Sequence, residues 1–278
     1  MEGERKTAVV TGGTRGIGLG ISKILARDGY NLILGYNSNV ERAQKAQSYL
    51  EEEYGAAVIV VKGDVCREET IAALFDAVEK HFDGRLHALV HNAGLYVGKS
   101  TTPSSDDARV AADEKLSLNT EQPLGAGSPE NFAQLDYYQK VYPKCFSRCV
   151  EKSLQHFEKS GEGHIICISS PGCNITQPPR VGYDMPGQAK TVMEFLTRYY
   201  AIQLAPKRIN VNCVIPGVTR SEAWGKVPLE NLASKICPMD EVIAPEEIGE
   251  AVSFLCKPTS RFITGVSLPV DGGLYLKV

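Results

Sequence analysis

The sequence predicts an α/β fold, a doubly wound Rossmann-type parallel sheet of about seven strands with helices on both faces. Short apolar runs alternate along the chain with stretches in which apolar residues recur at helical spacing. A glycine-rich turn joins the first apolar run to the first helical stretch. Strands of a parallel sheet covered on both faces have this continuous apolar character, which is the basis of the prediction.

The expected elements follow in a regular order. The first strand centres on the small and β-branched run 8–10, and Gly29 ends the first helix, Ile17–Asp28. The last expected helix opens Ala-Pro-Glu-Glu, which is typical of a helix start. The other expected strands are Asn31–Gly35, Ala57–Lys62, Leu86–Val90, Gly163–Ser169, Ile209–Val214 and Ile263–Val270. The other expected helices are Val40–Tyr54, Glu68–His81, Phe132–Lys159, Gly187–Ala205 and Pro245–Cys256.

Two stretches interrupt the alternation. Residues 95–134 are rich in Ser, Thr, Pro, Asp and Gly and are too long for an ordinary connection. We interpret them as an insertion, either a surface feature or an active-site or interface loop, with a short helix near 107–115. Residues 218–240 are polar and irregular. No repeat or linker divides the chain, so we expect a single domain over 1–278.

Composition and charge restrict the possible partners. The net charge of −3 argues against nucleic acid, and no apolar run approaches a membrane span. The first six residues carry no apolar signal region, so we expect a cytoplasmic protein. The eight cysteines form no C-x-x-C pair and have no neighbouring histidine ligands, which predicts reduced, mostly buried thiols and no metal site.

The glycine-rich turn, TGGTRGIG at 11–18, predicts a phosphate site. A helix N-terminus offers free N–H groups and a partial positive charge, where a dinucleotide pyrophosphate binds well. Gly12 permits the tight turn, Gly16 the close approach and Gly18 the packing of helix on strand. A simple strand-to-helix turn is the alternative. Ligands of such sheets bind beyond the carboxyl ends of the strands, where Thr11, Asp64 and Asn92 fall.

Several motifs in this order give the chain its resemblance to short-chain dehydrogenases/reductases. Each motif is weak alone, but together they span nearly the whole chain apart from the insertion. They are TGGTRGIG at 11–18, Asp64-Val65, Asn92-Ala93-Gly94, ISS at 168–170, Tyr183, Pro216-Gly217, and ITG…VDGG at 263–273.

The resemblance implies roles in cofactor binding. Asp64 would accept a hydrogen bond from the adenine amino group, and Asn92 would stabilise the sheet beside the cofactor. Residues 215–221 would lie along the nicotinamide, with Ser221 near its amide. A plain turn residue at Asp64 and a plain strand-end bond at Asn92 stay open as alternatives. The expected cofactor residues are Gly12, Thr14, Arg15, Gly16, Ile17, Gly18, Tyr36, Asn37, Ser38, Asp64, Val65, Asn92, Ala93, Gly94, Tyr183, Lys190, Pro216, Gly217, Val218 and Ser221.

Charge at the second strand favours NADP(H) over NAD. Enzymes that use the unphosphorylated cofactor usually place an acid there to bond the ribose hydroxyls. Residues 35–38 read Gly-Tyr-Asn-Ser and contain no acid. Arg15 supplies a cation that could meet a 2′-phosphate, although a solvated surface charge is the alternative.

The catalytic pattern implied by the resemblance is Ser, Tyr thirteen residues later, and Lys four residues after Tyr. Ser170 and Tyr183 match it, but Gly187 stands where the lysine belongs. The nearest lysine downstream is Lys190, whose Y-x6-K spacing resembles the divergent branch that includes bacterial enoyl-acyl-carrier-protein reductases. Because proline suits only the first turn of a helix, Pro186 places the helix start after Tyr183. Tyr183 could then approach Lys190, which would bind the ribose and lower the tyrosine pKa.

A further departure lies on the long helix, where Tyr142 occupies the position of the family's active-site Asn. We therefore treat Tyr142 as a substrate-site candidate together with Trp224, the possible wall of a substrate loop at 218–240. The ordinary glycine turn favours a ketone over a conjugated double bond as the group reduced.

The sequence thus predicts an NADPH-dependent oxidoreductase acting on a small-molecule carbonyl, with Tyr183 as proton donor. The alternatives are an enoyl or enone reductase, a dinucleotide-binding regulatory protein without redox chemistry, and a non-redox rearrangement with bound cofactor. Family habit implies a homodimer or homotetramer built on the helices 132–159 and 187–205.

Overall fold

The computed structural model describes residues 5–95, 129–179, 183–221 and 229–276. Its centre is one parallel sheet of seven strands in the order β3-β2-β1-β4-β5-β6-β7. The order reverses between β1 and β4, which is the switch point where doubly wound sheets bind ligands. The strands are β1 (Lys6–Thr11), β2 (Tyr30–Tyr36), β3 (Val58–Lys62), β4 (Ala88–His91), β5 (Gly163–Ile168), β6 (Ile209–Pro216) and β7 (Ser267–Val270).

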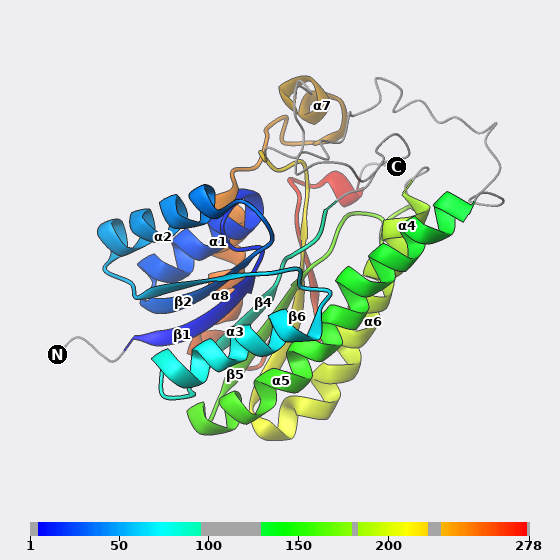
Figure 1. Ribbon diagram of the computed structural model, residues 1–278. Helices are drawn as coiled ribbons and strands as arrows, with labels where there is room; N and C mark the ends of the chain where they lie inside the picture. Colours follow the sequence, from blue (N-terminus) through cyan, green and yellow to red (C-terminus); the bar gives the residue numbers. More distant parts are fainter. Residues whose placement is uncertain (1–4, 96–128, 180–182, 222–228, 277–278) are drawn as a thin grey trace.

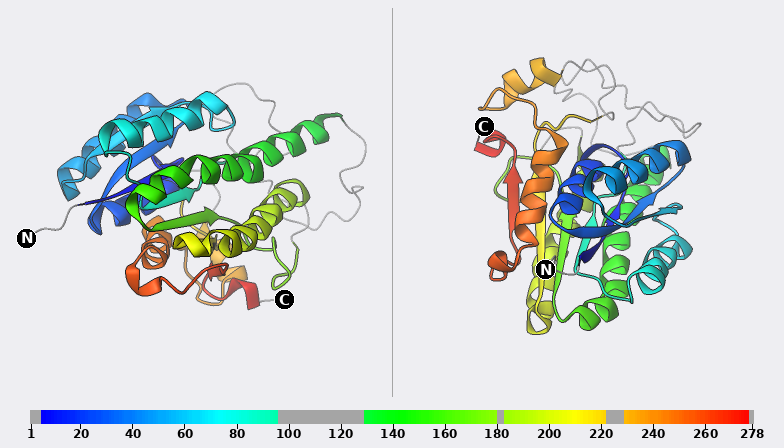
Figure 2. Two further views of the ribbon diagram at one scale, coloured as in Figure 1. Left: turned by 90° about the horizontal axis from the view of Figure 1, so that it is seen from below. Right: turned by 90° about the vertical axis from the view of Figure 1, so that its left-hand side faces the viewer.

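Helices cover both faces of this sheet, as Figures 1 and 2 show. On one face an apolar core joins the sheet to α1, α2 and α8, and on the other a second core joins it to α3, α5 and α6. The predicted α/β Rossmann-type fold is therefore confirmed. The helices are α1 (Gly16–Arg27), α2 (Val40–Tyr54), α3 (Glu68–His81), α4 (Pro129–Gln139), α5 (Cys145–Ser160), α6 (Asp184–Leu204), α7 (Leu229–Ile236) and α8 (Pro245–Leu255).

The single helix expected over 132–159 is corrected by the structure. It is built as α4, a π-helical turn η1 (Lys140–Lys144) and α5 in direct succession. Pro143 lies inside the π-turn and has no N–H for the helical ladder. The N–H of Cys145 donates to the carbonyls of Lys140 and Tyr142, which releases the carbonyl of Val141 from the ladder.

Two expected irregular stretches contain helix. Residues 129–134, assigned to the insertion, belong to α4, while 96–128 lie outside the described residues. The polar stretch 218–240 contains α7, a two-turn helix whose buried residues are Leu229 and Ala233 and whose helical apolar spacing the prediction overlooked. The final strand is shorter than expected, because β7 begins at Ser267 and the left-handed Gly265 (φ +77°) precedes it. Among the described residues, no helix has the length and apolar character needed to span a membrane.

Candidate active site

The glycine turn lies between β1 and α1. Gly12 and Gly16 adopt left-handed backbone conformations, with φ of +66° and +49°. A Cβ at Gly18 would lie 2.0 Å from the carbonyl oxygen of Gly12, so no side chain fits there. The turn therefore brings the N-terminus of α1 to the carboxyl end of the sheet with its first N–H groups unoccupied by the helix. This is a cradle that suits a dinucleotide phosphate.

Thr11 organises the two strand ends at the switch point. Its hydroxyl oxygen accepts hydrogen bonds from the backbone N–H groups of Asn92 (3.1 Å) and Ala93 (3.0 Å). The Asn92 amide donates to the carbonyls of Thr11 and Gly12, both at 3.2 Å. The strand-end alternative for Asn92 thus describes its contacts well, and those contacts hold the glycine turn against β4.

His91 extends this network to the π-turn, a link that the sequence pattern does not predict. Its Nε2 lies 3.0 Å from the carbonyl oxygen of Val141, the group released by the π-turn, and its Nδ1 lies 3.4 Å from the Thr11 hydroxyl. An Nε2–H donor and an Nδ1 acceptor satisfy both contacts. Burial lowers the pKa of His91 to about 4, so the ring is neutral near pH 7.

The side chains expected to contact the adenine and its ribose are more exposed than those at the switch point. Asp64 is exposed, and its carboxylate accepts from the backbone N–H of Cys66 at 2.9 Å, which fits the turn-residue alternative. Arg15, Asn37 and Ser38 are exposed at strand and turn ends. The remaining expected cofactor residues in these segments are buried or half-buried: Thr14, Ile17, Tyr36 and Val65.

Ser170 and Tyr183 meet directly beyond the end of β5. The Tyr183 hydroxyl donates to the Ser170 Oγ at 2.9 Å. Tyr183 is the residue before α6, with φ −112° and ψ 21°, and α6 begins at Asp184. The helix start expected from Pro186 is therefore confirmed, and the thirteen-residue spacing does bring the two hydroxyls together.

Lys190 is buried two turns into α6, with 7% of the residue exposed. Its ammonium donates to the carbonyl oxygens of Ile168 (3.1 Å) and Ser169 (3.2 Å), the residues just before Ser170. Burial lowers the pKa of Lys190 from its ordinary value. The side chain thus points into the protein at the end of β5, not along a surface face of the helix.

Tyr142 lies against the same ammonium. The Lys190 Nζ is 4.6 Å from the centre of the Tyr142 ring, a cation–π distance. A Cβ at Gly94 would lie 2.3 Å from the Tyr142 ring, so glycine at that position lets the ring approach the end of β4. Burial raises the pKa of the Tyr142 phenol well above its ordinary value. Tyr142, expected at the substrate site, is therefore a neutral buried ring beside Lys190.

The segment after β6 returns to the glycine turn. A Cβ at Gly16 would have the Cβ of Ser221 at 3.5 Å as its nearest neighbour. A Cβ at Gly217 would lie 2.7 Å from the Asp271 backbone, so β6 and β7 end in close contact. Pro216, the last residue of β6, and Val218 are both buried. Trp224 and residues 222–228 of the expected substrate loop lie outside the described residues.

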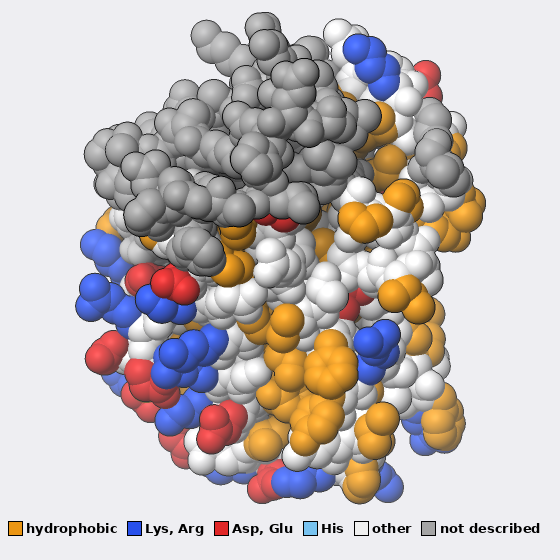
Figure 3. All heavy atoms as spheres, turned by 90° about the vertical axis from the view of Figure 1, so that its right-hand side faces the viewer, with side chains coloured by type: hydrophobic (Ala, Val, Ile, Leu, Met, Phe, Trp, Pro, Cys, Tyr) orange, Lys and Arg blue, Asp and Glu red, His pale blue; other side chains and the backbone are white. Residues whose placement is uncertain are grey.

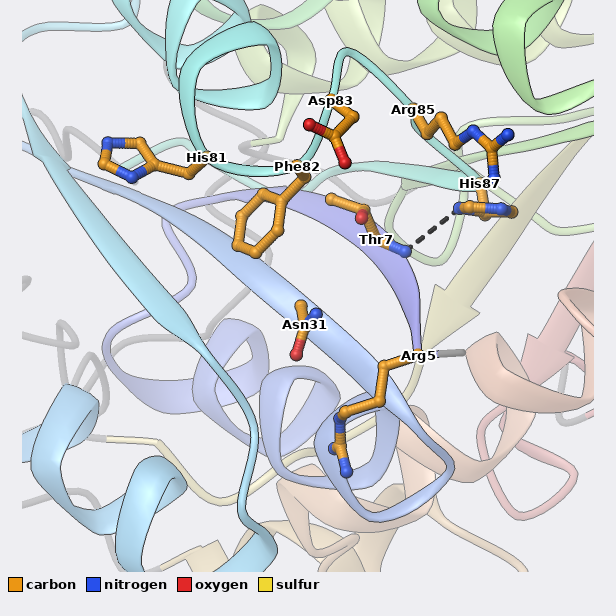
Figure 4. A pocket seen from close by; sticks show the side chains of 8 residues that line it. All are labelled: Arg5, Thr7, Asn31, His81, Phe82, Asp83, Arg85 and His87. Atoms are coloured by element: carbon orange, nitrogen blue, oxygen red, sulfur yellow. Dashed lines mark hydrogen bonds between the residues drawn. The ribbon is translucent and has the colours of Figure 1, made fainter. Parts of the chain in front are cut away.

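A cavity of about 330 Å³ lies away from all these groups, at the amino end of the sheet (Figure 4). Its lining includes Arg5, Asp83 and His87. The Arg5 guanidinium donates to the carbonyls of Tyr54, Ala26 and Tyr30, and the His87 Nδ1 accepts from the N–H of Thr7. These groups therefore fasten elements together, and the cavity is remote from the candidate site.

Comparisons with known proteins agree with this arrangement. A family model described as "short chain dehydrogenase" matches residues 6–123, and one described as "Enoyl-(Acyl carrier protein) reductase" matches residues 119–275. A hydroxynaphthalene reductase-like protein of Metarhizium anisopliae is 28% identical over 283 residues, covering 96% of this chain and 94% of that protein.

Solved structures have the same fold. L-Sorbose reductase from Gluconobacter frateurii, complexed with NADPH and L-sorbose, superposes with a TM-score of 0.79 at 22% identity, covering 99% of this chain and 98% of that one. A short-chain dehydrogenase from Burkholderia cenocepacia in complex with NADP has a TM-score of 0.79 at 25% identity, with 97% of both chains covered.

Proposed function

The chain belongs to the short-chain dehydrogenase/reductase family, and we propose that it is an NADPH-dependent reductase of a carbonyl group on a small-molecule substrate. The observation that supports this most is the 2.9 Å hydrogen bond between the Tyr183 and Ser170 hydroxyls. It lies beyond the carboxyl end of β5, and the Lys190 ammonium is bound to the two residues before Ser170. A proton donor and an oxygen-binding hydroxyl are thus adjacent at the edge that holds the glycine cradle.

In this proposal the chain's own residues manage the substrate oxygen and its proton. A nicotinamide cofactor, when bound, would supply the hydride. Ser170 would hold the carbonyl oxygen, and Tyr183 would donate its hydroxyl proton to that oxygen as negative charge develops. The buried positive charge of Lys190 would favour the phenolate that remains.

The choice of NADP(H) is part of the proposal. Residues 36–38 at the end of β2 contain no carboxylate to bond the ribose hydroxyls, and Arg15 is exposed at the turn. The relative from Burkholderia cenocepacia, solved in complex with NADP, supports the same cofactor class. The glycine turn fits a dinucleotide because a Cβ at Gly18 would overlap the Gly12 carbonyl and close the turn.

Reduction of a carbon–carbon double bond conjugated to a carbonyl is the second candidate. It is favoured by the description of the model that matches 119–275 and by the Y-x6-K spacing of Tyr183 and Lys190. In that case Tyr183 and Ser170 would stabilise the enolate oxygen with the same contacts.

The test is the rate of NADPH oxidation with matched panels of ketones and enones. We expect Tyr183→Phe to lower kcat/KM on the preferred panel by about 10²- to 10⁴-fold, because the proton donor is lost. Tyr49→Phe, at an exposed tyrosine on the remote helix α2, is the control and should retain the rate. An unchanged rate in Tyr183→Phe would remove Tyr183 from the reaction. NADPH binding without turnover of either panel would instead support a regulatory dinucleotide-binding protein.

A further inference from the structure

Glu194 is a buried carboxylate whose function the sequence pattern does not predict. It lies on α6 one turn after Lys190, and only 3% of the residue is exposed. Its Oε1 accepts from the Ser169 hydroxyl at 2.5 Å. Its Oε2 accepts from the Asn174 amide at 3.0 Å and from the Ser267 hydroxyl at 2.8 Å. Three donors and no acceptor indicate an ionised carboxylate.

These contacts tie together the segments that surround Ser170. Ser169 directly follows β5, Asn174 lies in the loop after Ser170, and Ser267 begins β7. Ser169 is bonded on three sides: its hydroxyl to Glu194, its carbonyl to Lys190, and its N–H to the carbonyl of Val214. Ser170 follows directly, so the position of its hydroxyl depends on a residue that Glu194 and Lys190 hold jointly.

The groups around the Lys190 ammonium come from several elements. β5, the following loop and β6 contribute the thiols of Cys167, Cys173 and Cys213, and the π-turn and β4 contribute the rings of Tyr142 and His91. Burial raises the pKa values of the Cys173 and Cys213 thiols and of the Tyr142 phenol, and lowers that of His91 to about 4. These four groups are therefore neutral near pH 7.

The Glu194 carboxylate is linked to Lys190 through Ser169, whose hydroxyl donates to Glu194 and whose carbonyl accepts from the ammonium, and its negative charge favours the protonated lysine. The described contacts of this buried ammonium are two carbonyl oxygens and a ring face. It has therefore lost most of its hydration, and a nearby negative charge stabilises it.

We infer that Glu194 is a positioning residue of the active site, which fixes the Ser169–Ser170 segment and supplies the counter-charge that keeps the buried Lys190 ammonium protonated. It touches neither substrate nor cofactor in this scheme and acts through its two neighbours. The inference rests on the proposed reductase function for its kinetic consequence, but its electrostatic part can be measured without turnover.

The kinetic experiment is the pH dependence of kcat/KM in Glu194→Gln, which preserves shape and removes the charge. Loss of the negative charge should lower the pKa of the group that limits activity at high pH, so the alkaline limb should move down by about one pH unit. Asn174→Ala and Ser267→Ala each remove one hydrogen bond to Glu194 without changing its charge, and their alkaline limbs should stay in place. If Glu194→Gln is active and its alkaline limb does not move, or if both controls shift equally, Glu194 has only a structural role and the inference is wrong.

The second experiment follows the Lys190 pKa directly by NMR of protein labelled with ¹³C at lysine Cε, with the signal assigned from Lys190→Arg. We expect the Lys190 pKa to fall in Glu194→Gln and to be retained in Ser267→Ala. An unchanged Lys190 pKa in Glu194→Gln overturns the inference whatever the enzyme reduces, whereas absence of turnover in the unmodified protein overturns only the proposed function.

Glu194→Asp provides the same test if Glu194→Gln does not fold. The shorter side chain retains the charge but moves it away from Lys190, so we expect a smaller fall in the Lys190 pKa than full removal of the charge would cause. A Lys190 pKa equal to that of the unmodified protein would contradict the inference.

Discussion

At the scale of single residues, the site departs from its family pattern in two places that contact each other. Lys190 stands three positions after the lysine position that the family resemblance implies, and Tyr142 stands where the resemblance implies an asparagine. The structure joins the two through the 4.6 Å contact between ammonium and ring. The sequence identifies each residue as a candidate, but their contact depends on how the π-turn presents Tyr142, which no local pattern encodes.

Arg15 carries the prediction about cofactor choice. A guanidinium binds a phosphate bidentately, whereas the hydroxyl of NAD offers it no charge. We expect Arg15→Ala to raise the KM for NADPH about tenfold and to leave the KM for NADH nearly unchanged. Steady-state kinetics with both cofactors measures the difference. Arg261→Ala, at an exposed arginine that stacks over Phe262 ahead of β7, is the control. An equal effect on both cofactors would show that Arg15 does not read the 2′-phosphate.

His91 carries a prediction about acid stability. Its pKa is lowered to about 4 in the folded protein, against about 6.5 in the unfolded chain. Between these values the unfolded chain binds a proton that the folded protein does not, so stability is full above pH 6.5 and falls as the pH drops toward 4. The loss from His91 between pH 7.5 and 5 should be about 2 kcal/mol. His164, whose pKa burial also lowers to about 4, should add to it.

Urea denaturation at the two pH values checks this expectation. His91→Asn removes the titrating ring and should flatten the dependence by about 2 kcal/mol, even if it lowers stability overall. His81→Asn, at the exposed end of α3, should leave the pH dependence as it is. The idea fails if His91→Asn and the unmodified protein lose equal stability on acidification.

At the scale of elements, periodicity predicts most strands and helices because their apolar faces are strong. The errors of prediction from periodicity lie where tertiary contacts override the local preference of the sequence. Pro143 should end a helix, yet the π-turn accommodates it and the freed Val141 carbonyl contacts His91. α7 escapes prediction because it is only two turns long within a polar stretch. The burial of Glu194 is not predicted because its three hydrogen-bond partners are distant in sequence.

α1 packs closely on α8, with no space for a side chain at Gly20 or Gly249. A Cβ at Gly20 would lie 2.3 Å from the backbone of Pro245. We expect Gly20→Ala to push the helices apart and lower the free energy of unfolding by about 1–3 kcal/mol. NADPH affinity should fall as well, because α1 carries the phosphate cradle.

Gly187→Ala is the matched helix substitution. Its Cβ would have only the Tyr183 ring at 3.6 Å, so it should be neutral or stabilise by up to about 1 kcal/mol. Urea unfolding curves of the two variants measure the contrast. Equal stability of both variants would mean that the α1–α8 contact relaxes without cost.

At the scale of the whole molecule, α6 has one face toward the candidate site and an opposite face toward solvent. Lys190 and Glu194 face inward, while Val192, Phe195, Tyr199 and Ile202 form an exposed apolar stripe along its other side. Phe195 is 56% exposed and Ile202 is 81% exposed. Figure 3 shows hydrophobic side chains gathered on this face of the molecule. Exposed patches of this kind usually mark an interaction surface.

We expect a second copy of the chain to cover this stripe, giving a homodimer or homotetramer. The double substitution Phe195→Glu with Ile202→Glu places charges in the contact. It should raise the dissociation constant of the assembly about one hundredfold or more, and sedimentation velocity would then detect a smaller species. Tyr49→Glu, on the remote helix α2, should not change the assembly. A monomeric unmodified protein would contradict the expectation.

Because all strands run in one direction, the two ends of the chain differ in how well they suit a tag or immobilisation on a surface. Arg5 fastens the start of β1 to the ends of α1 and α2, at the sheet edge remote from Tyr183. An affinity tag or resin linker placed ahead of β1 would emerge about 20 Å from the Ser170 and Tyr183 hydroxyls, one strand length away. By contrast, η5 (Leu274–Leu276) follows β7 at the reactive edge (Figure 1). Immobilisation through the amino end should leave substrate entry open, and coupling after Leu276 should crowd it.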